Sequence, residues 1–356
     1  MEGLRGLAVL LVFLVHYESL LEPWIAADAS LGVVAGALRI IGNSGVDLFF
    51  VLSGYLIYGS LLTRQQSFLH FFTRRLQRIY PAFTAVFALY VALSFLLPSE
   101  NKIPKDGAAL YLLENYLLLP GLLPIQPMIT VAWSLSYEMF YYLALPVFMA
   151  ALKLRDRTVT WRLIFFLSMT VVLAASLGMA GGPIRLLMFV SGIVLHEVMS
   201  HSKLRISGSA GLTALLIGLA AMLLPVGGRF GEACQILILF VAFLVFCLAC
   251  FRTPQAWLPS AFSWTPLRWL GNMSYSYYLL HGLALKGGFM AIGLVLPPTG
   301  QQSELHWLLL IPMLLLTLIS SAVLFLVIEQ PFSLAPRRSR GAVDLPQAAS
   351  ASESGS

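Results

Sequence analysis

The sequence predicts an all-α integral membrane protein with about ten transmembrane helices and both termini in the cytoplasm. Three observations lead to this fold class. Of the 356 residues, 59% are hydrophobic and 11% are charged, whereas roughly 25% of the residues of soluble domains are charged. Apolar runs of about 20 residues, the length that crosses a bilayer, recur along the chain. Basic residues gather in the short segments between these runs, as they do in the cytoplasmic loops of membrane proteins.

The spans are placed by hydropathy, in order along the chain. They cover residues 4–21, 44–62, 77–97, 133–152, 161–178, 183–200, 207–224, 232–251, 268–296 and 305–328. The ninth span is long, and Gly287 and Gly288 are expected to kink or break it. The segment 98–132 holds the apolar sequence LLENYLLLPGLLPIQP. Its prolines interrupt a helix, so we expect an interfacial or re-entrant piece there rather than a span.

The distribution of basic residues sets the orientation. If the N-terminus lies in the cytoplasm, the cytoplasmic segments hold 16 of the 22 lysine and arginine residues, so the positive-inside rule favours this orientation. Residues 1–336 then form one transmembrane domain, and the polar tail 337–356 is expected to be disordered in the cytoplasm. A cleaved signal peptide at 1–30 is disfavoured, because His16 and Glu18 interrupt its apolar core.

Four ionisable residues stand out inside predicted spans, where a charge near the bilayer centre is unfavourable by roughly 2.5–3.5 kcal/mol. They are His16, Asp47, Glu138 and His281. The first three are expected at a similar depth in the outer half of the membrane, with His281 near them. Structural alternatives stay open for each. Asp47 could cap a helix, Glu138 and His16 could pair across helices, and His281 could be a packing residue.

Arg5 and His16 share one face of the first predicted helix. The step of eleven residues between them corresponds to about 1100° of rotation and about 16.5 Å of rise. With Arg5 at the cytoplasmic edge, this rise carries His16 beyond the midplane of the membrane. Arg5 alone could instead be an anchor whose side chain extends to the lipid headgroups.

A second basic cluster lies in the sequence FFTRRLQRIYP, between the second and third spans. Arg75 and Arg78 are three residues apart, with Arg74 beside them, so guanidinium groups share one face of the entering helix. Arginine binds phosphate oxygens through paired hydrogen bonds, which suits an anion site. A positive-inside signal alone would explain the cluster equally well.

These residues lie in motifs that resemble the membrane-bound acyltransferase-3 family. The motifs occur in order over residues 3–332 as LRGLAVLLVFLVH, GVDLFFVLSGYLI, RRLQRIYPAF, WSLSYEMFYYLALPV, YSYYLLHG and IEQPF. The resemblance implies a ten-helix domain that uses cytoplasmic acyl-CoA, commonly acetyl-CoA, to acylate a sugar hydroxyl across the membrane. Some members carry a further extracytoplasmic hydrolase-like domain. This chain ends soon after its tenth span, so no second domain is expected.

The resemblance also assigns roles to residues of this sequence. It maps the functional positions of the family onto Arg5, His16, Asp47, Arg75, Arg78 and Glu138. We expect His16 to deprotonate the acceptor hydroxyl, while Glu138 or Asp47 orients its ring. The three arginines are expected to hold the phosphates of CoA. Weaker candidates for contact with the acceptor are His281, Tyr137 and Trp133.

The predicted enzyme needs an acyl-CoA donor, a saccharide or glycolipid acceptor and the lipid bilayer of a bacterial inner membrane. We expect no tightly bound cofactor, no nucleic acid and no metal, and the three cysteines lie in one apolar stretch that suggests no disulfide framework. The competing function is a proton-coupled transporter or flippase of a glycan or lipid-linked sugar, because intramembrane His, Asp and Glu also build such carriers. The paired broken helices of inverted-repeat carriers are not evident in the sequence.

Overall fold

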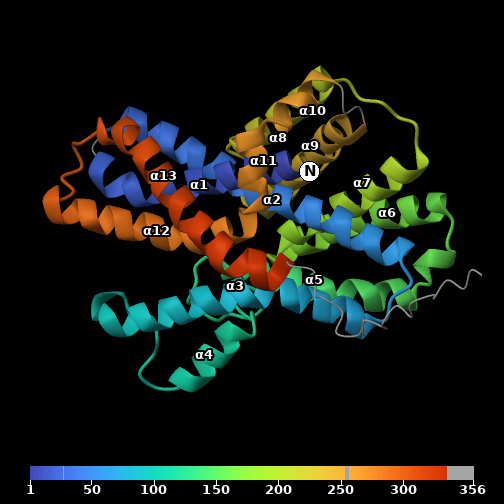
Figure 1. Ribbon diagram of the computed structural model, residues 1–356. Helices are drawn as coiled ribbons and strands as arrows, with labels where there is room; N and C mark the ends of the chain where they lie inside the picture. Colours follow the sequence, from blue (N-terminus) through green and yellow to red (C-terminus); the bar gives the residue numbers. More distant parts are fainter. Residues whose placement is uncertain (27, 253–255, 335–356) are drawn as a thin grey trace, which may run out of the picture.

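The structure, a computed structural model, describes residues 1–26, 28–252 and 256–334 (Figure 1). Within these ranges the regular elements are helices. Those of eight residues or more are α1 (Glu2–Ile25), α2 (Ala29–Thr63), α3 (Phe68–Leu96), α4 (Ala108–Tyr116), α5 (Ala132–Ala151), α6 (Val159–Ala180), α7 (Leu187–His201), α8 (Gly208–Met222), α9 (Gly228–Arg252), α11 (Thr265–Asn272), α12 (Ser274–Val295), α13 (Leu305–Leu324) and the π-helix η4 (Phe325–Leu334). Four short helices join them: η1 (Pro98–Glu100), η2 (Leu154–Asp156), η3 (Ile184–Leu186) and α10 (Trp257–Phe262). The predicted tail 337–356 lies outside the described residues.

The all-α membrane fold is confirmed. Among the described residues, eight helices are long and apolar enough to cross a bilayer, namely α1, α2, α3, α6, α9, α12, the combined helix Ile184–His201 and the combined helix Leu305–Leu334. The fourth and seventh predicted spans correspond to α5 and α8, so the total of ten spans stays a prediction. The cytoplasmic position of both termini stays a prediction as well.

The second and third helices begin earlier than hydropathy predicted. α2 starts at Ala29 rather than at residue 44, because the side chain of Asp28 caps it by accepting a hydrogen bond from the Leu31 amide at 3.0 Å. That bond and one from the Ser30 hydroxyl lower the pKa of the Asp28 carboxyl to about 2. A helix of 35 residues is about 52 Å long, so it extends well beyond the ~30 Å hydrocarbon layer.

The predicted break at Gly287 and Gly288 is wrong. α12 runs without interruption through both residues, and the chain changes helix at Met273, between α11 and α12. A Cβ atom at Gly288 would lie 2.9 Å from the Met313 sulfur of α13. This glycine therefore permits close packing of α12 on α13.

α1 lies at the centre of the helix arrangement, where it contacts α2, α11, α12 and α13 (Figure 1). Glycines on α2 allow the closest of these approaches. A Cβ atom at Gly45 would lie 2.5 Å from the Ala8 carbonyl oxygen of α1, and one at Gly54 would lie 2.2 Å from the Phe189 carbonyl oxygen of α7. α2 is thereby clamped between α1 and α7, and this fixes the face that it turns toward the site described below.

The segment between α3 and α5 contains no helix long enough to cross a bilayer, and its longest helix, α4, has 9 residues. Lys102 holds this segment together by donating to the carbonyl oxygens of Pro127 and Met128, at 3.4 and 3.3 Å. Burial lowers the pKa of Lys102, the neighbouring Lys286 lowers it further and Glu100 opposes the shift. The structure agrees with the expectation that this segment is not a span.

Candidate active site

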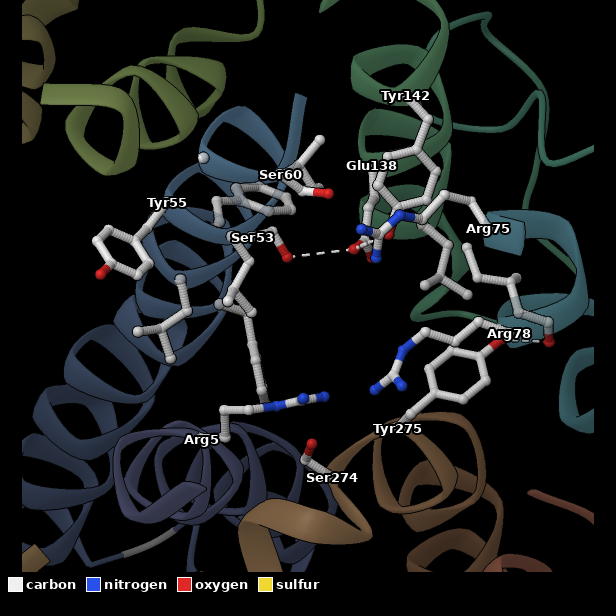
Figure 2. A pocket seen from close by; sticks show the side chains of 18 of the residues that line it. Arg5, Ser53, Tyr55, Ser60, Arg75, Arg78, Glu138, Tyr142, Ser274 and Tyr275 are labelled. Atoms are coloured by element: carbon white, nitrogen blue, oxygen red, sulfur yellow. Dashed lines mark hydrogen bonds between the residues drawn. The ribbon is translucent and has the colours of Figure 1, made fainter. Parts of the chain in front are cut away.

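Several charged side chains line a cavity of about 550 Å³ (Figure 2). Its wall follows one face of α2 from Arg64 to Val46, a step of 18 residues that corresponds to about 27 Å along the helix. α1, α3, α5, α7 and α12 complete the wall. The polar lining residues include Arg5, Ser53, Arg64, Arg75, Arg78, Ser134, Glu138, Tyr142, His196, Ser274, Tyr275 and Tyr278.

The three arginines predicted to bind CoA come together in this cavity. Arg5 lies near the start of α1, and Arg75 and Arg78 lie in the first half of α3. Figure 2 shows their guanidinium groups directed into the same space. The Arg75 guanidinium also lies over the rings of Phe71 and Tyr142, 5.4 and 5.5 Å from their centroids. Such contacts hold the group in place, and the arrangement forms a site of strong positive potential that suits a polyanion.

Glu138 lies in the arginine cavity rather than beside His16, so the predicted grouping of these two residues is wrong. Its carboxylate accepts hydrogen bonds from the Ser53 hydroxyl at 3.1 Å and from the Tyr142 hydroxyl one turn later on α5. His16 is not among the described residues that line the cavity. The bonds to Ser53 and Tyr142 hold the carboxylate at the cavity wall, between α2 and α5.

Asp47 is likewise engaged elsewhere. Its fully buried carboxylate forms an ion pair with Arg185 at 2.9 Å, and Arg185 also donates to the Asn43 carbonyl oxygen at 3.2 Å. Because α2 begins at Ala29, Asp47 lies in the helix interior and does not cap the helix start, which corrects the capping alternative. Asp47 therefore joins α2 to the start of the span that contains α7, and neither predicted carboxylate partner of His16 contacts its ring.

His16 and His281, which the sequence placed at a similar depth in the membrane, contact each other. Their rings meet edge to face with centroids 4.9 Å apart. His281 is fully buried and stacks on the ring of Tyr277, with centroids 5.2 Å apart and an angle of 6° between the planes. The pair joins α1 to α12 in the middle of both helices.

Tyr278 stands between the arginine cavity and the histidine pair. Its ring lines the cavity, and the ring centroid lies 5.9 Å from that of His281. Its hydroxyl is 2.6 Å from the Ser134 hydroxyl and donates to the Val131 carbonyl oxygen at 3.1 Å. The cavity thus leads from the predicted cytoplasmic end of α2 to Tyr278, whose ring packs against that of His281.

Trp133 and Tyr137, the two weaker candidates on α5, pack together rather than against the arginines. Their ring centroids are 5.6 Å apart, and both rings pack against Phe50 of α2, at 6.5 and 6.2 Å. Both side chains are partly exposed. They form an aromatic surface near the start of α5, on the predicted outer side.

His306 and His196, for which the sequence predicts no role, lie beside Glu18 and at the arginine cavity. His306 is buried, and its Nε2 lies 3.0 Å from a carboxylate oxygen of Glu18, two residues beyond His16. The Tyr17 hydroxyl donates to the backbone carbonyl of His306 at 2.6 Å. His196 lines the arginine cavity. An acidic residue within an apolar span, here Glu18, could have indicated the Glu18–His306 pair. His196 lies near the end of a predicted span, and nothing in the sequence indicated that it lines the cavity.

Comparison with known proteins identifies the type of protein that this site belongs to. Residues 1–326 match the family described as an acyltransferase domain, acyltransferase-3. The chain is 27% identical to the acyltransferase MdmB of Streptomyces mycarofaciens over 93% of its own length and 90% of the relative. It is 26% identical to the peptidoglycan O-acetyltransferase OatA of Listeria monocytogenes over 79% of its length, and spans 48% of that relative. No solved structure matches the chain.

Proposed function

The chain belongs to the acyltransferase-3 family and is a membrane O-acetyltransferase, and from that premise we propose that it transfers an acetyl group from cytoplasmic acetyl-CoA to a hydroxyl of an extracytoplasmic saccharide or glycolipid. The convergence of Arg5, Arg75 and Arg78 in a cavity that leads to the histidine pair carries this proposal. Membership of an enzyme family removes the reason to prefer a transporter or flippase.

The donor occupies the arginine cavity. The guanidinium groups bind the phosphates of CoA, for which their planar, paired donors are suited. A second cavity of about 870 Å³ shares Arg5 and Arg78 with the first and is bordered by Glu2, Asn272 and Gln330. Phosphates held at the two shared arginines have access to both cavities. The pantetheine arm extends along α2 toward Tyr278, which brings the thioester close to His16.

His16 acts as the general base. It takes the proton of the acceptor hydroxyl as the oxygen bonds to the acetyl carbon, the carbon–sulfur bond breaks, and the proton passes to the departing CoA thiolate. A relay through an acetylated His16 would use the same residues. Glu138 belongs to the donor site, where its bonds to Ser53 and Tyr142 keep a negative charge beside the arginines.

The acceptor approaches from the outer side. Trp133 and Tyr137 present partly exposed rings there, and amphipathic aromatic rings are suited to contact a sugar with their faces and to bond its hydroxyls with their polar edges. A relative named a peptidoglycan O-acetyltransferase supports a saccharide acceptor. The bacterial relatives support a location in the cell membrane. The segment between α3 and α5 contributes to acceptor choice.

A deletion strain complemented with variants tests the base. We expect His16→Ala to remove ester-linked acetyl groups from the envelope glycan that the wild-type protein modifies, as measured by mass spectrometry of each glycan. His70→Ala is the matched control, since His70 is exposed near the start of α3, and it should leave acetylation unchanged. Acetylation at the wild-type level in the His16→Ala strain would contradict the assignment.

A further inference from the structure

The base His16 requires a neighbour that selects which of its nitrogens carries the proton, because only an unprotonated nitrogen can accept the proton of a hydroxyl. Carboxylates are the usual choice for this task. The two carboxylates predicted to assist His16, and the one nearest to it along its own helix, are engaged elsewhere. Asp47 pairs with Arg185, Glu138 accepts from Ser53, and Glu18 pairs with His306.

His281 has the free nitrogen that this task needs. Its Nδ1 lies 2.8 Å from the Tyr277 carbonyl oxygen. A carbonyl oxygen can only accept, so Nδ1 carries the proton, and in the neutral ring Nε2 is a bare acceptor. That Nε2 atom is buried and has no hydrogen-bond partner among the described residues. An unpaired buried acceptor is unfavourable, and its retention calls for an explanation.

The ring of His281 is also held in a fixed orientation. It stacks on Tyr277 with an angle of 6° between the planes. Tyr277 is itself fully buried, and its hydroxyl lies 2.9 Å from the Thr317 hydroxyl of α13. Stacking and the bond at Nδ1 together leave His281 little freedom to rotate. Its bare Nε2 therefore keeps one direction, as an element that orients another group must.

We propose that His281 is a positioning residue for the acetyl transfer, whose Nε2 accepts a hydrogen bond from the imidazole N–H of His16. The second nitrogen of His16 is then the unprotonated one and faces the acceptor hydroxyl. A separation of 4.9 Å between the ring centroids allows facing nitrogens to reach the ~3 Å of a hydrogen bond. In free enzymes such bonds are often loose, and they tighten when substrate binds. His281 neither gains nor loses a proton, so the bonds that form and break in the transfer are those described above for His16.

This inference rests on the proposed function, and the same assay tests both separately. Inverted membrane vesicles from the complemented deletion strain supply the endogenous acceptor, and radiolabelled acetyl-CoA is added from outside. His281→Phe keeps the ring and its stacking but removes the acceptor nitrogen. His281→Gln restores an acceptor oxygen on a flexible side chain. Melting temperatures of the purified variants in detergent show whether each one folds.

We expect His281→Phe to lower kcat at least about 100-fold with the KM for acetyl-CoA within twofold of wild type, and His281→Gln to recover about tenfold of that loss. Equal rates for His281→Phe and wild type would overturn the inference, and so would equal losses in both variants. A raised KM with unchanged kcat would also overturn it. If wild-type vesicles transferred no label, the proposed function itself would fail instead.

Discussion

Asp47 and Glu138 are both acidic residues within apolar helices, but their neighbours give them different tasks. The carboxylate of Asp47 is fully buried against Arg185, whose side chain is 27% exposed. Glu138 lies at the wall of a cavity with three arginines around it. The Asp47–Arg185 pair joins two helices, whereas Glu138 adds a negative charge to the arginine cavity. Substitution of Asp47 is therefore expected to affect stability, and substitution of Glu138 to affect binding.

Asp47→Ala is expected to destabilise the protein. Removing one partner of a buried pair leaves the other charge uncompensated, which is unfavourable by on the order of 3 kcal/mol. The melting temperature in detergent should fall, and the double variant Asp47→Ala with Arg185→Met should recover part of the loss. An unchanged melting temperature together with lost acetyl transfer would instead favour the catalytic role that the sequence suggested.

Glu138→Gln is expected to tighten the binding of acetyl-CoA by about fivefold to thirtyfold. The substitution removes a negative charge beside the site of the phosphates, and charges at this range interact by 1–2 kcal/mol at an effective dielectric of about 20. Glu304→Gln, at an exposed position before α13, is the control. Calorimetric titration with acetyl-CoA measures the effect, and weaker binding in Glu138→Gln would contradict this account of the cavity.

Residue types were predictable from the sequence, but their partners were not. An ionisable side chain in an apolar run is visible without a structure, which is why His16, Asp47, Glu138 and His281 were all identified. The partner of Asp47 is 138 positions away along the chain. Nothing in hydropathy selects Arg185 over another arginine, because the pairing depends on how α2 rotates against the helix that follows Arg185.

At the scale of helices, the close approach of α1, α2 and α7 determines where the site residues point. Gly45 faces α1, Gly54 faces α7, and Ser53 and Asp47 lie between these contacts on the same helix. A small change in either contact would rotate or displace α2 and separate the arginine cavity from the histidine pair.

Gly45→Ala and Gly36→Ala, both on α2, are expected to have opposite effects. A Cβ atom at Gly45 would lie 2.5 Å from the Ala8 carbonyl oxygen, whereas nothing lies within 4 Å of one at Gly36. The first substitution should lower the melting temperature and the transfer rate. The second should stabilise α2 slightly, since alanine favours helix by up to about 1 kcal/mol over glycine. Equal melting temperatures for the two variants would show that the α1–α2 contact is not as close as described.

The centres of the helices were predictable, and their ends were less so. Hydropathy selects runs of bilayer length and does not mark where a helix begins, so it missed the first fifteen residues of α2 and the first nine of α3. The capping residues Asp28 and Ser67 mark both true starts. Gly287 and Gly288 misled in the opposite direction, because α12 continues through both residues and Gly288 makes close packing on α13 possible.

Across the whole molecule, the site has two parts joined by one cavity. Three arginines at the predicted cytoplasmic end form the first part, and the histidine pair behind Tyr278 forms the second. The sequence predicted both sets of residues. It did not predict that Glu138 lies with the arginines. The course of the long segment between α3 and α5 cannot be read from hydropathy, and this segment determines where α5 packs.

The central claim is that the arginine cavity binds the donor. Calorimetric titration of the purified protein with acetyl-CoA in detergent tests it most directly, with Arg78→Ala compared with Arg157→Ala, an exposed arginine that stacks on Trp161 away from the cavity. We predict micromolar or tighter binding for the wild type, at least about tenfold weaker binding for Arg78→Ala and unchanged binding for Arg157→Ala. No binding to the wild type, or equal binding to both variants, would contradict the account.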